Sequence, residues 1–173
     1  MYQQFNKYKI LRTFFDEPNK KFQLRELERR TGISLPSVKQ HVKDLQRYGF
    51  LKEDKEGVYT GFKSSLSDKY RMFKRNDLLI RLEECGLLTE IEERCTPNCI
   101  ALYGSGVEGR DDERGDIDLF VQSKKYNINL AHYEHQLKRR ISLLFESRIE
   151  QIDDKLKNTL ANGIVLRGFL KVI

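Results

Sequence analysis

The stretch ALYGSGVEGRDDERGDIDLF, residues 101–120, combines closely spaced glycines with two aspartates one residue apart. Gly104, Gly106 and Gly109 match the spacing of a dinucleotide-binding loop, and the apolar CIALY before them is typical of the strand that such a loop follows. A dinucleotide fold, however, needs a full helix and a further strand before its acidic residue, about twenty residues on. Here DDERGDIDLF reaches a new strand within about ten residues, so no room is left for that helix. We therefore reject NAD as the ligand.

The two aspartates indicate a metal site. Asp116 and Asp118 point to one side of a predicted strand, DIDLFV, because side chains alternate along a strand. Neighbouring carboxylates repel each other unless a cation neutralises them, and hard oxygen ligands suit Mg²⁺ bound together with substrate phosphates. Gly104 and Ser105, at the expected junction of strand and helix, would let backbone amides and a hydroxyl approach those phosphates. Such a site can support an in-line phosphoryl or nucleotidyl displacement.

The combination GSGVEG and DIDLFV resembles the minimal nucleotidyltransferases of the DNA polymerase beta superfamily. The resemblance implies that Gly104 and Ser105 bind a nucleoside triphosphate, in the first place ATP, and that Asp116 and Asp118 ligate metal, with two Mg²⁺ ions expected. It also implies a third carboxylate on a neighbouring strand. After an expected helix, YEHQLKRRISLLFES, the segment RIEQI offers Glu150 for that role, as a metal ligand or as the base that accepts the proton of the attacking hydroxyl.

The resemblance covers about residues 78–173, and LKNTLANGIVLRG is similar to the helix and closing apolar segment of such domains. The chain departs from the family pattern at four positions. It has Val107 and Glu108 where the family commonly has a small residue and an arginine, Gly115 where a serine often precedes the first aspartate, and Glu150 where an aspartate is more usual. Arg110 and Arg114 are near enough in the sequence to replace the missing arginine.

The amino-terminal third predicts a different kind of domain. After a first helix in residues 5–15, FQLRELERRTGISLPSVKQHVKDLQRYGFL predicts two helices joined by a tight turn at Gly32, the second running from Ser34 to Tyr48. FLKEDKEGVYTGFK then predicts a hairpin. This arrangement resembles a winged helix-turn-helix domain over about residues 4–65.

The second of these helices carries candidate DNA-binding residues on the face opposite its apolar positions: Ser37, Lys39, Gln40 and Lys43. The lysines would bind phosphates, while serine and glutamine could reach base edges of double-stranded DNA. A protein-interaction module is the alternative for a small helical domain with a hairpin. Winged helices often read palindromic sites as dimers, so a homodimer is compatible with this interpretation.

The expected fold class is α+β. A winged helix-turn-helix domain, residues 1–66, precedes a helical connector, residues 67–95, and an α/β nucleotidyltransferase domain with a small mixed sheet, residues 96–173. The formal net charge of +6 is modest, so its distribution matters more than its size. The odd number of cysteines favours free thiols, and the absence of a long apolar run excludes a membrane segment. We expect a cytoplasmic protein.

The expected activity is Mg²⁺-dependent transfer of a nucleoside monophosphate, AMP from ATP, to a hydroxyl acceptor, with release of pyrophosphate. The catalytic half is too short to contain the nucleic-acid-handling domain of a polymerase. The resemblance therefore favours a hydroxyl on a protein acceptor such as a partner toxin, with a tRNA end as the second choice. The alternative function is a winged-helix transcription regulator whose nucleotidyltransferase domain senses nucleotide or mediates dimerisation without turnover.

Overall fold

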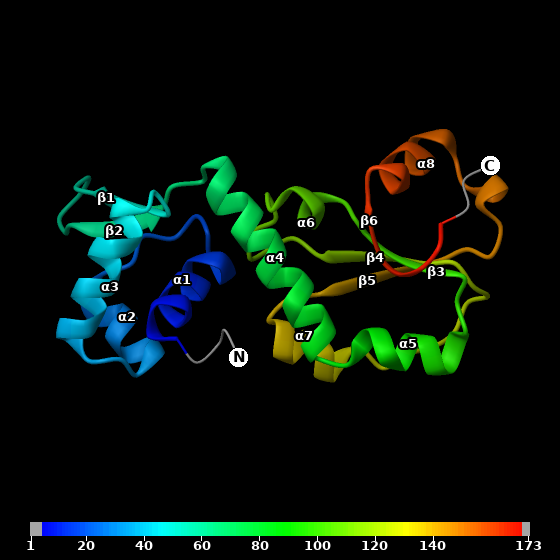
Figure 1. Cartoon of the computed structure of the whole chain (residues 1–173), viewed down its shortest axis with the longest axis horizontal. Coiled ribbons are helices and arrows are strands. Elements are labelled where there is room, and N and C mark those ends of the chain that lie inside the picture. The colour runs from blue at the N-terminus through cyan, green and yellow to red at the C-terminus, as the bar shows by residue number, and fades with distance from the viewer. Residues whose placement is uncertain (1–4, 171–173) are drawn as a thin grey trace. The chain divides into compact units, whose positions relative to one another are not determined.

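The computed structural model describes residues 5–170, so the ends of the expected first and last domains, residues 1–4 and 171–173, lie outside the described residues. The chain forms two compact units, Met1–Lys74 and Arg75–Ile173. The α+β architecture is confirmed: helices with a two-stranded hairpin come first, and a mixed four-stranded sheet with helices follows (Figure 1).

The first unit contains three helices and the hairpin. In chain order, α1, α2, α3, β1 and β2 span Asn6–Asp16, Leu24–Thr31, Leu35–Arg47, Leu51–Asp54 and Gly61–Ser64. Each helix turns one apolar face into a common core, and β1 pairs antiparallel with β2. The φ of Gly32 is +68°, a left-handed conformation that glycine adopts without strain, so the chain turns sharply from α2 into α3. The helices and the hairpin expected from the sequence are thus present.

The two units divide inside one helix, α4, Asp68–Glu84. Tyr70, in its first turn, is fully buried in the core of the first unit and donates a hydrogen bond of 2.6 Å to a backbone carbonyl of α1. Leu78, further along, is buried in the core of the second unit. Residues 67–95 therefore do not form a separate connector, because their apolar side chains belong to two cores.

The second unit is built around a sheet with the strand order β5-β4-β3-β6. After α4, its elements are α5 (Leu87–Cys95), β3 (Cys99–Tyr103), α6 (Ser105–Glu108), β4 (Ile117–Val121), α7 (Ala131–Leu137), β5 (Ile141–Phe145), the 3₁₀ helix η2 (Ile149–Gln151), α8 (Asp154–Ala161) and β6 (Ile164–Gly168). β3 is antiparallel to both β4 and β6, whereas β4 and β5 are parallel. The expected mixed sheet is confirmed.

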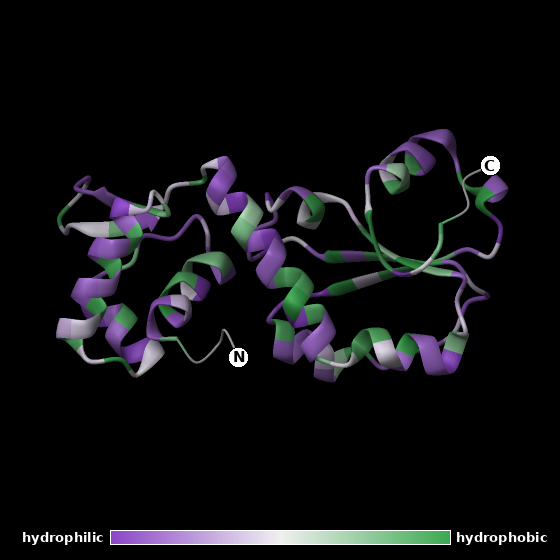
Figure 2. Ribbon diagram, viewed as in Figure 1, coloured by the Kyte–Doolittle hydropathy of each residue, from purple (hydrophilic) through white to green (hydrophobic). Residues whose placement is uncertain are grey.

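The two faces of this sheet carry different side chains. Along β4, Ile117, Leu119 and Val121 pack against α4, α5 and α7, while Phe120 packs on the opposite face with apolar residues of α8. Because side chains alternate along a strand, Asp118 belongs to the face of Phe120. Figure 1 shows α8 on one side of the sheet and α5 with α7 on the other. Figure 2 shows that most of α8 is hydrophilic. The metal-binding candidate Asp118 therefore lies on the α8 face.

Two expected elements are wrong. We expected YEHQLKRRISLLFES, residues 133–147, to form one helix and RIEQI, residues 148–152, to form the next strand. Instead α7 ends at Leu137, Lys138 adopts a left-handed conformation, and ISLLF forms β5. RIEQI forms a loop that contains η2. The reason is that a short apolar run suits a buried strand as well as a buried helix, and periodicity alone does not separate them.

The carboxyl-terminal segment follows the sequence-based expectation of a helix and an apolar strand. The Asp153 side chain caps α8 by accepting a hydrogen bond of 2.9 Å from the backbone N–H of Leu156. β6 then joins the sheet at its edge, beside β3. Among residues 5–170, no helix has the length and apolar character needed to cross a membrane.

Candidate functional site

Asp116 and Asp118 lie at the start of β4. Asp116 immediately precedes the strand and is exposed, whereas Asp118 lies within it and is half-buried. In the sheet, Asp118 is paired with Tyr103 of β3 on one side and with Ser142 of β5 on the other. The two carboxylates are thus held at the edge of a buried core, where a cation can reach them from solvent.

The electrostatics of the pair favour a bound cation. Burial raises the pKa of Asp118 above its usual value, and the negative charge of Asp116 raises this pKa further. Burial, followed by the charge of Asp118, also raises the pKa of Tyr103. These shifts mean that negative charge is poorly solvated at this position, so a cation that compensates it would be bound favourably.

Gly104 links the glycine turn to the aspartates. Its φ and ψ of 75° and −154° suit glycine, and it directly precedes α6. A Cβ atom at this position would lie 2.5 Å from Oδ2 of Asp118, a distance that no side chain could tolerate without displacing the carboxylate. Ser105 follows, exposed, and its hydroxyl makes no hydrogen bond to the part of the chain that the structure describes. The sequence-predicted residues Gly104, Ser105 and Asp118 are therefore brought together.

Arg139 fixes the loop that leads to Asp116. Its guanidinium group donates one hydrogen bond of 2.7 Å to the Gly115 carbonyl oxygen and another of 2.7 Å to Oδ2 of Asp111. The side chains of this ion pair are 8% and 5% exposed, so the pair is well shielded from water. Sequence reasoning missed Arg139, because nothing near it in the sequence signals a partner 28 residues away.

Asp112 stabilises the same loop locally. Its Oδ1 accepts hydrogen bonds of 3.0 and 3.1 Å from the backbone N–H groups of Arg114 and Gly115. A Cβ atom at Gly115 would come no closer than 3.6 Å to any atom outside its neighbours. A serine would therefore fit there, so the departure from the family pattern at Gly115 is not imposed by the fold.

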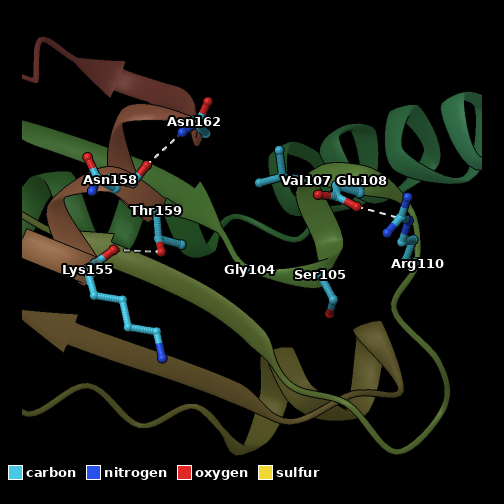
Figure 3. A pocket seen from close by; sticks show the side chains of 9 residues that line it. All are labelled: Gly104, Ser105, Val107, Glu108, Arg110, Lys155, Asn158, Thr159 and Asn162. Carbon is cyan, nitrogen blue, oxygen red and sulfur yellow. Dashed lines mark hydrogen bonds and ion pairs between the residues drawn. The ribbon is translucent and has the colours of Figure 1, made fainter.

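A pocket of about 770 Å³ opens beside the glycine turn. Its lining comes from the α6 turn, from α8 and from Asn162 directly after α8: Gly104, Ser105, Val107, Glu108, Arg110, Lys155, Asn158, Thr159 and Asn162 (Figure 3). Sequence reasoning did not single out the last four of these residues. Their spacing of three, four and seven residues along one helix is the signal that could have found them.

Arg110 does not present a free positive charge to this pocket. Its Nε lies 2.9 Å from Oε2 of Glu108, and Figure 3 shows the two side chains paired beside α6. Because the carboxylate offsets the guanidinium charge, Arg110 is a poor replacement for the arginine that the family commonly has in place of Glu108.

Glu150 is not placed as expected. It lies in η2, exposed to solvent, and not on a strand beside the aspartates. The neighbouring strand β5 contains no carboxylate, and Ser142 occupies the position in register with Asp118. Within residues 5–170, no group of three or more Asp, Glu, His or Cys side chains has the arrangement of a metal site. The structure thus brings Asp116 and Asp118 together without a third carboxylate.

The candidate DNA-binding residues lie on α3. Lys39, Gln40 and Lys43 are exposed, and Ser37 is half-buried. The two lysines form no ion pair with the residues that the structure describes. Gln40 donates a hydrogen bond of 3.2 Å to Asp44, which also lies 2.9 Å from the amine of Lys7.

The hairpin adds further charges and two exposed apolar side chains. Lys63 is paired with Asp54, and this hydrogen bond is the main reason that the pKa of Asp54 falls to about 2. Val58 and Tyr59, near the tip, are 87% and 67% exposed. Lys63 is therefore engaged within the hairpin, whereas Lys39 and Lys43 of α3 are available to a ligand.

Comparison of this chain with protein-family models, with curated proteins and with solved structures finds no match.

Proposed function

We propose that this chain is a DNA-binding protein whose second unit binds a Mg²⁺-nucleoside triphosphate, with ATP as the substrate, and transfers the nucleoside monophosphate to a hydroxyl acceptor. The observation that carries the proposal is the contact between Gly104 and Asp118. Gly104 has a backbone conformation that suits glycine, with φ 75° and ψ −154°, and a Cβ atom there would lie 2.5 Å from a carboxylate oxygen of Asp118, so the turn proposed to bind phosphate lies directly beside the strand proposed to bind metal. This is the arrangement expected of a nucleotidyltransferase site.

The residues present fit a magnesium site. Asp116 and Asp118 supply hard oxygen ligands, and Mg²⁺ commonly takes one or two protein carboxylates and completes its coordination with phosphates and water. Two ions would share these carboxylates. Bound Mg²⁺ would neutralise the phosphate oxygens and favour ionisation of the acceptor hydroxyl.

The reaction is a displacement at the α-phosphorus. The acceptor oxygen forms a bond to this phosphorus, the bond to the bridging oxygen of the β-phosphate breaks, and pyrophosphate leaves. The acceptor proton passes to solvent. Gly104 and Ser105 would hold the triphosphate, and Asp116 and Asp118 would orient it through the metal. Since phosphoryl transfer depends mainly on positioning and electrostatic stabilisation, the lack of a neighbouring base lowers the rate without preventing the step.

The acceptor is proposed from the resemblance to minimal nucleotidyltransferases. A protein hydroxyl, as on a partner toxin, is the first choice of acceptor, and a tRNA end is the second.

The first unit is proposed to bind duplex DNA as a winged helix-turn-helix domain. Support comes from α3, where Lys39 and Lys43 are exposed while the apolar face of the same helix is buried in the core. These lysines would bind phosphates, and Ser37 would approach base edges. Gln40 would exchange its bond to Asp44 for one to a base.

A second candidate function is a transcription regulator that binds the nucleotide without turnover. It is favoured by Ser142, which stands beside Asp118 where a third carboxylate was expected. A site with two carboxylates and no neighbouring base can bind Mg²⁺-nucleotide and report its presence without consuming it.

One experiment separates the two functions. The protein is incubated with Mg²⁺ and ATP labelled at either the α- or the γ-phosphate, in the presence of total tRNA or of purified products of the adjacent genes. Transfer of the α-label, but not of the γ-label, together with release of pyrophosphate supports the enzyme. Nucleotide binding without label transfer supports the regulator, and an absence of nucleotide binding contradicts both.

DNA binding is tested separately with the full chain. Lys39→Ala and Lys43→Ala should each weaken binding to all duplexes alike and reduce the slope of log affinity against log salt by about one. Lys124→Ala, in the second unit, removes the same charge elsewhere and should leave the slope unchanged. If the wild-type chain has no salt-dependent affinity for any duplex in a random-pool selection, the first unit is a protein-interaction module.

A further inference from the structure

The pocket beside the glycine turn has two walls with different charge. On the α6 wall, the charges of Glu108 and Arg110 offset each other at 2.9 Å. On the opposite wall, formed by α8 and by Asn162 directly after it, Asn158, Thr159 and Asn162 are uncharged, and Lys155 is the only cation among the described residues that line it. The uncompensated positive charge of this pocket therefore lies on α8, where an entering polyphosphate would contact it.

Lys155 is unpaired, unlike the next lysine on the same helix. Lys157 lies 3.2 Å from Oδ1 of Asp154, whereas the amine of Lys155 forms no ion pair or hydrogen bond with any residue in the range 5–170. The backbone carbonyl of Lys155 accepts a 3.0 Å hydrogen bond from the Thr159 hydroxyl, a contact that does not involve the Lys155 side chain. The Lys155 ammonium group is thus available to a ligand.

The direction of the side chains is consistent with a shared ligand. Lys155 and Ser105 both line the pocket, and Figure 3 shows the Lys155 side chain, from α8, and the Ser105 side chain, from the α6 turn, pointing to the same side of the view. Asp118 belongs to the sheet face that α8 covers. Its carboxylate lies beside Gly104, which is part of the other wall of the pocket. A ligand that coordinates metal at Asp118 and rests on the glycine turn would lie next to α8.

We propose that Lys155 binds the polyphosphate of the nucleotide and supplies the positive charge that the α6 turn lacks. This inference rests on the proposed function and adds a residue from a separate element to the site. Lysine acts on phosphate as a mobile point charge, so it can follow the ligand from an exposed helix position. The contact would distinguish a triphosphate from a nucleoside or a nucleoside monophosphate.

The test compares binding of four probes by calorimetric titration in the presence of Mg²⁺: ATP, ADP, AMP and adenosine. Lys155→Ala should weaken ATP binding on the order of tenfold, as expected for the loss of one exposed charge-assisted contact, and should leave adenosine binding unchanged. Lys155→Gln, which keeps the aliphatic stem, should behave like Lys155→Ala, whereas Lys155→Arg should retain most of the affinity. Lys157→Ala removes the same charge from the same helix and should bind ATP as the wild type does.

The outcomes separate this inference from the proposed function. If the wild-type protein binds Mg²⁺-ATP and Asp118→Asn abolishes that binding while Lys155→Ala leaves it intact, only the inference about Lys155 is overturned. An equal loss of ATP and adenosine affinity in Lys155→Ala would also overturn it, because adenosine has no phosphate and the loss of a phosphate contact cannot weaken its binding. If the wild-type protein binds none of the four probes, both proposals fail.

Discussion

Asp118 and Ser142 stand side by side in the parallel register of β4 and β5. Both lie on the sheet face that α8 covers, because each is offset by two residues from an inward-facing partner, Phe120 and Leu144. The hydroxyl of Ser142 therefore occupies the place where a carboxylate would complete a three-carboxylate metal site.

The first prediction uses this position. Ser142→Asp should tighten Mg²⁺ binding, since a third oxygen ligand is added next to Asp118. In the absence of metal the same change should lower the melting temperature, because three carboxylates then repel one another. Metal titration and thermal unfolding with and without Mg²⁺ measure the two effects. Ser142→Asn is the control, because asparagine is similar in size to aspartate but has no charge. Equal metal affinity in Ser142→Asp and Ser142→Asn would contradict the assigned register.

The second prediction concerns Gly104. Gly104→Ala should lower the free energy of unfolding by about 2 kcal/mol, because it adds backbone strain at a positive φ and forces the Asp118 carboxylate to move. It should also abolish Mg²⁺-nucleotide binding. Urea unfolding and calorimetry provide the measurements. Gly115→Ala is the matched control, since its Cβ atom meets nothing closer than 3.6 Å, and it should retain both properties.

The third prediction concerns the ion pair between Asp111 and Arg139. Arg139→Gln should cost about 3 kcal/mol of stability, because it removes the guanidinium group from a buried ion pair and frees the loop that ends at Asp116. Metal affinity should fall as well. Arg140→Gln removes a neighbouring exposed charge and should change neither quantity. Wild-type stability in Arg139→Gln would show that the pair is dispensable.

The fourth prediction is a pH dependence in the hairpin. The Lys63 amine and the Glu56 backbone N–H hold the pKa of Asp54 at about 2, below the ordinary value of 3.8. A lowered folded-state pKa means that the ionised group stabilises the fold above about pH 4 and that this contribution disappears as the pH falls through 2. Asp54→Asn should thus lower the melting temperature at pH 7, and this deficit should be much smaller at pH 2, where about half of the Asp54 carboxylates are protonated in the folded protein. Glu53→Gln, at an exposed neighbouring position, should have little effect at either pH. A deficit in Asp54→Asn that is as large at pH 2 as at pH 7 would argue against this ion pair.

The fold could be predicted from the sequence wherever a local signal was strong. Gly32 ends a helix because the turn requires a left-handed conformation, and the segment DIDL at the start of the aspartate strand alternates between polar and apolar residues. ISLLF was misread as helix because five apolar or small residues suit either structure, and its true partner, β4, lies more than twenty residues away in the sequence. The boundary between the units was missed because α4 is one continuous helix whose two ends belong to different cores.

Of the candidate site, only the residues that belong to a sequence motif could be predicted from the sequence. Gly104, Ser105, Asp116 and Asp118 lie within fifteen residues of one another, so their spacing alone indicated a common site. Lys155 and Arg139 enter through tertiary structure, from a helix and a loop that have no motif of their own. Glu150 was chosen because it lies in RIEQI, the segment expected to form the strand beside Asp118; that strand is β5 instead, and the residue next to Asp118 is Ser142.

The central claim is that Asp116 and Asp118 bind a Mg²⁺-nucleotide, and the most direct measurement is calorimetric titration of ATP with and without Mg²⁺. For the wild-type protein we expect binding that requires the metal. Asp116→Asn and Asp118→Asn, which keep the side-chain size, should each abolish the metal-dependent part while the melting temperature of the metal-free protein is kept or raised. ATP binding of equal affinity in the wild type and both variants, or binding that does not depend on Mg²⁺, would contradict the account.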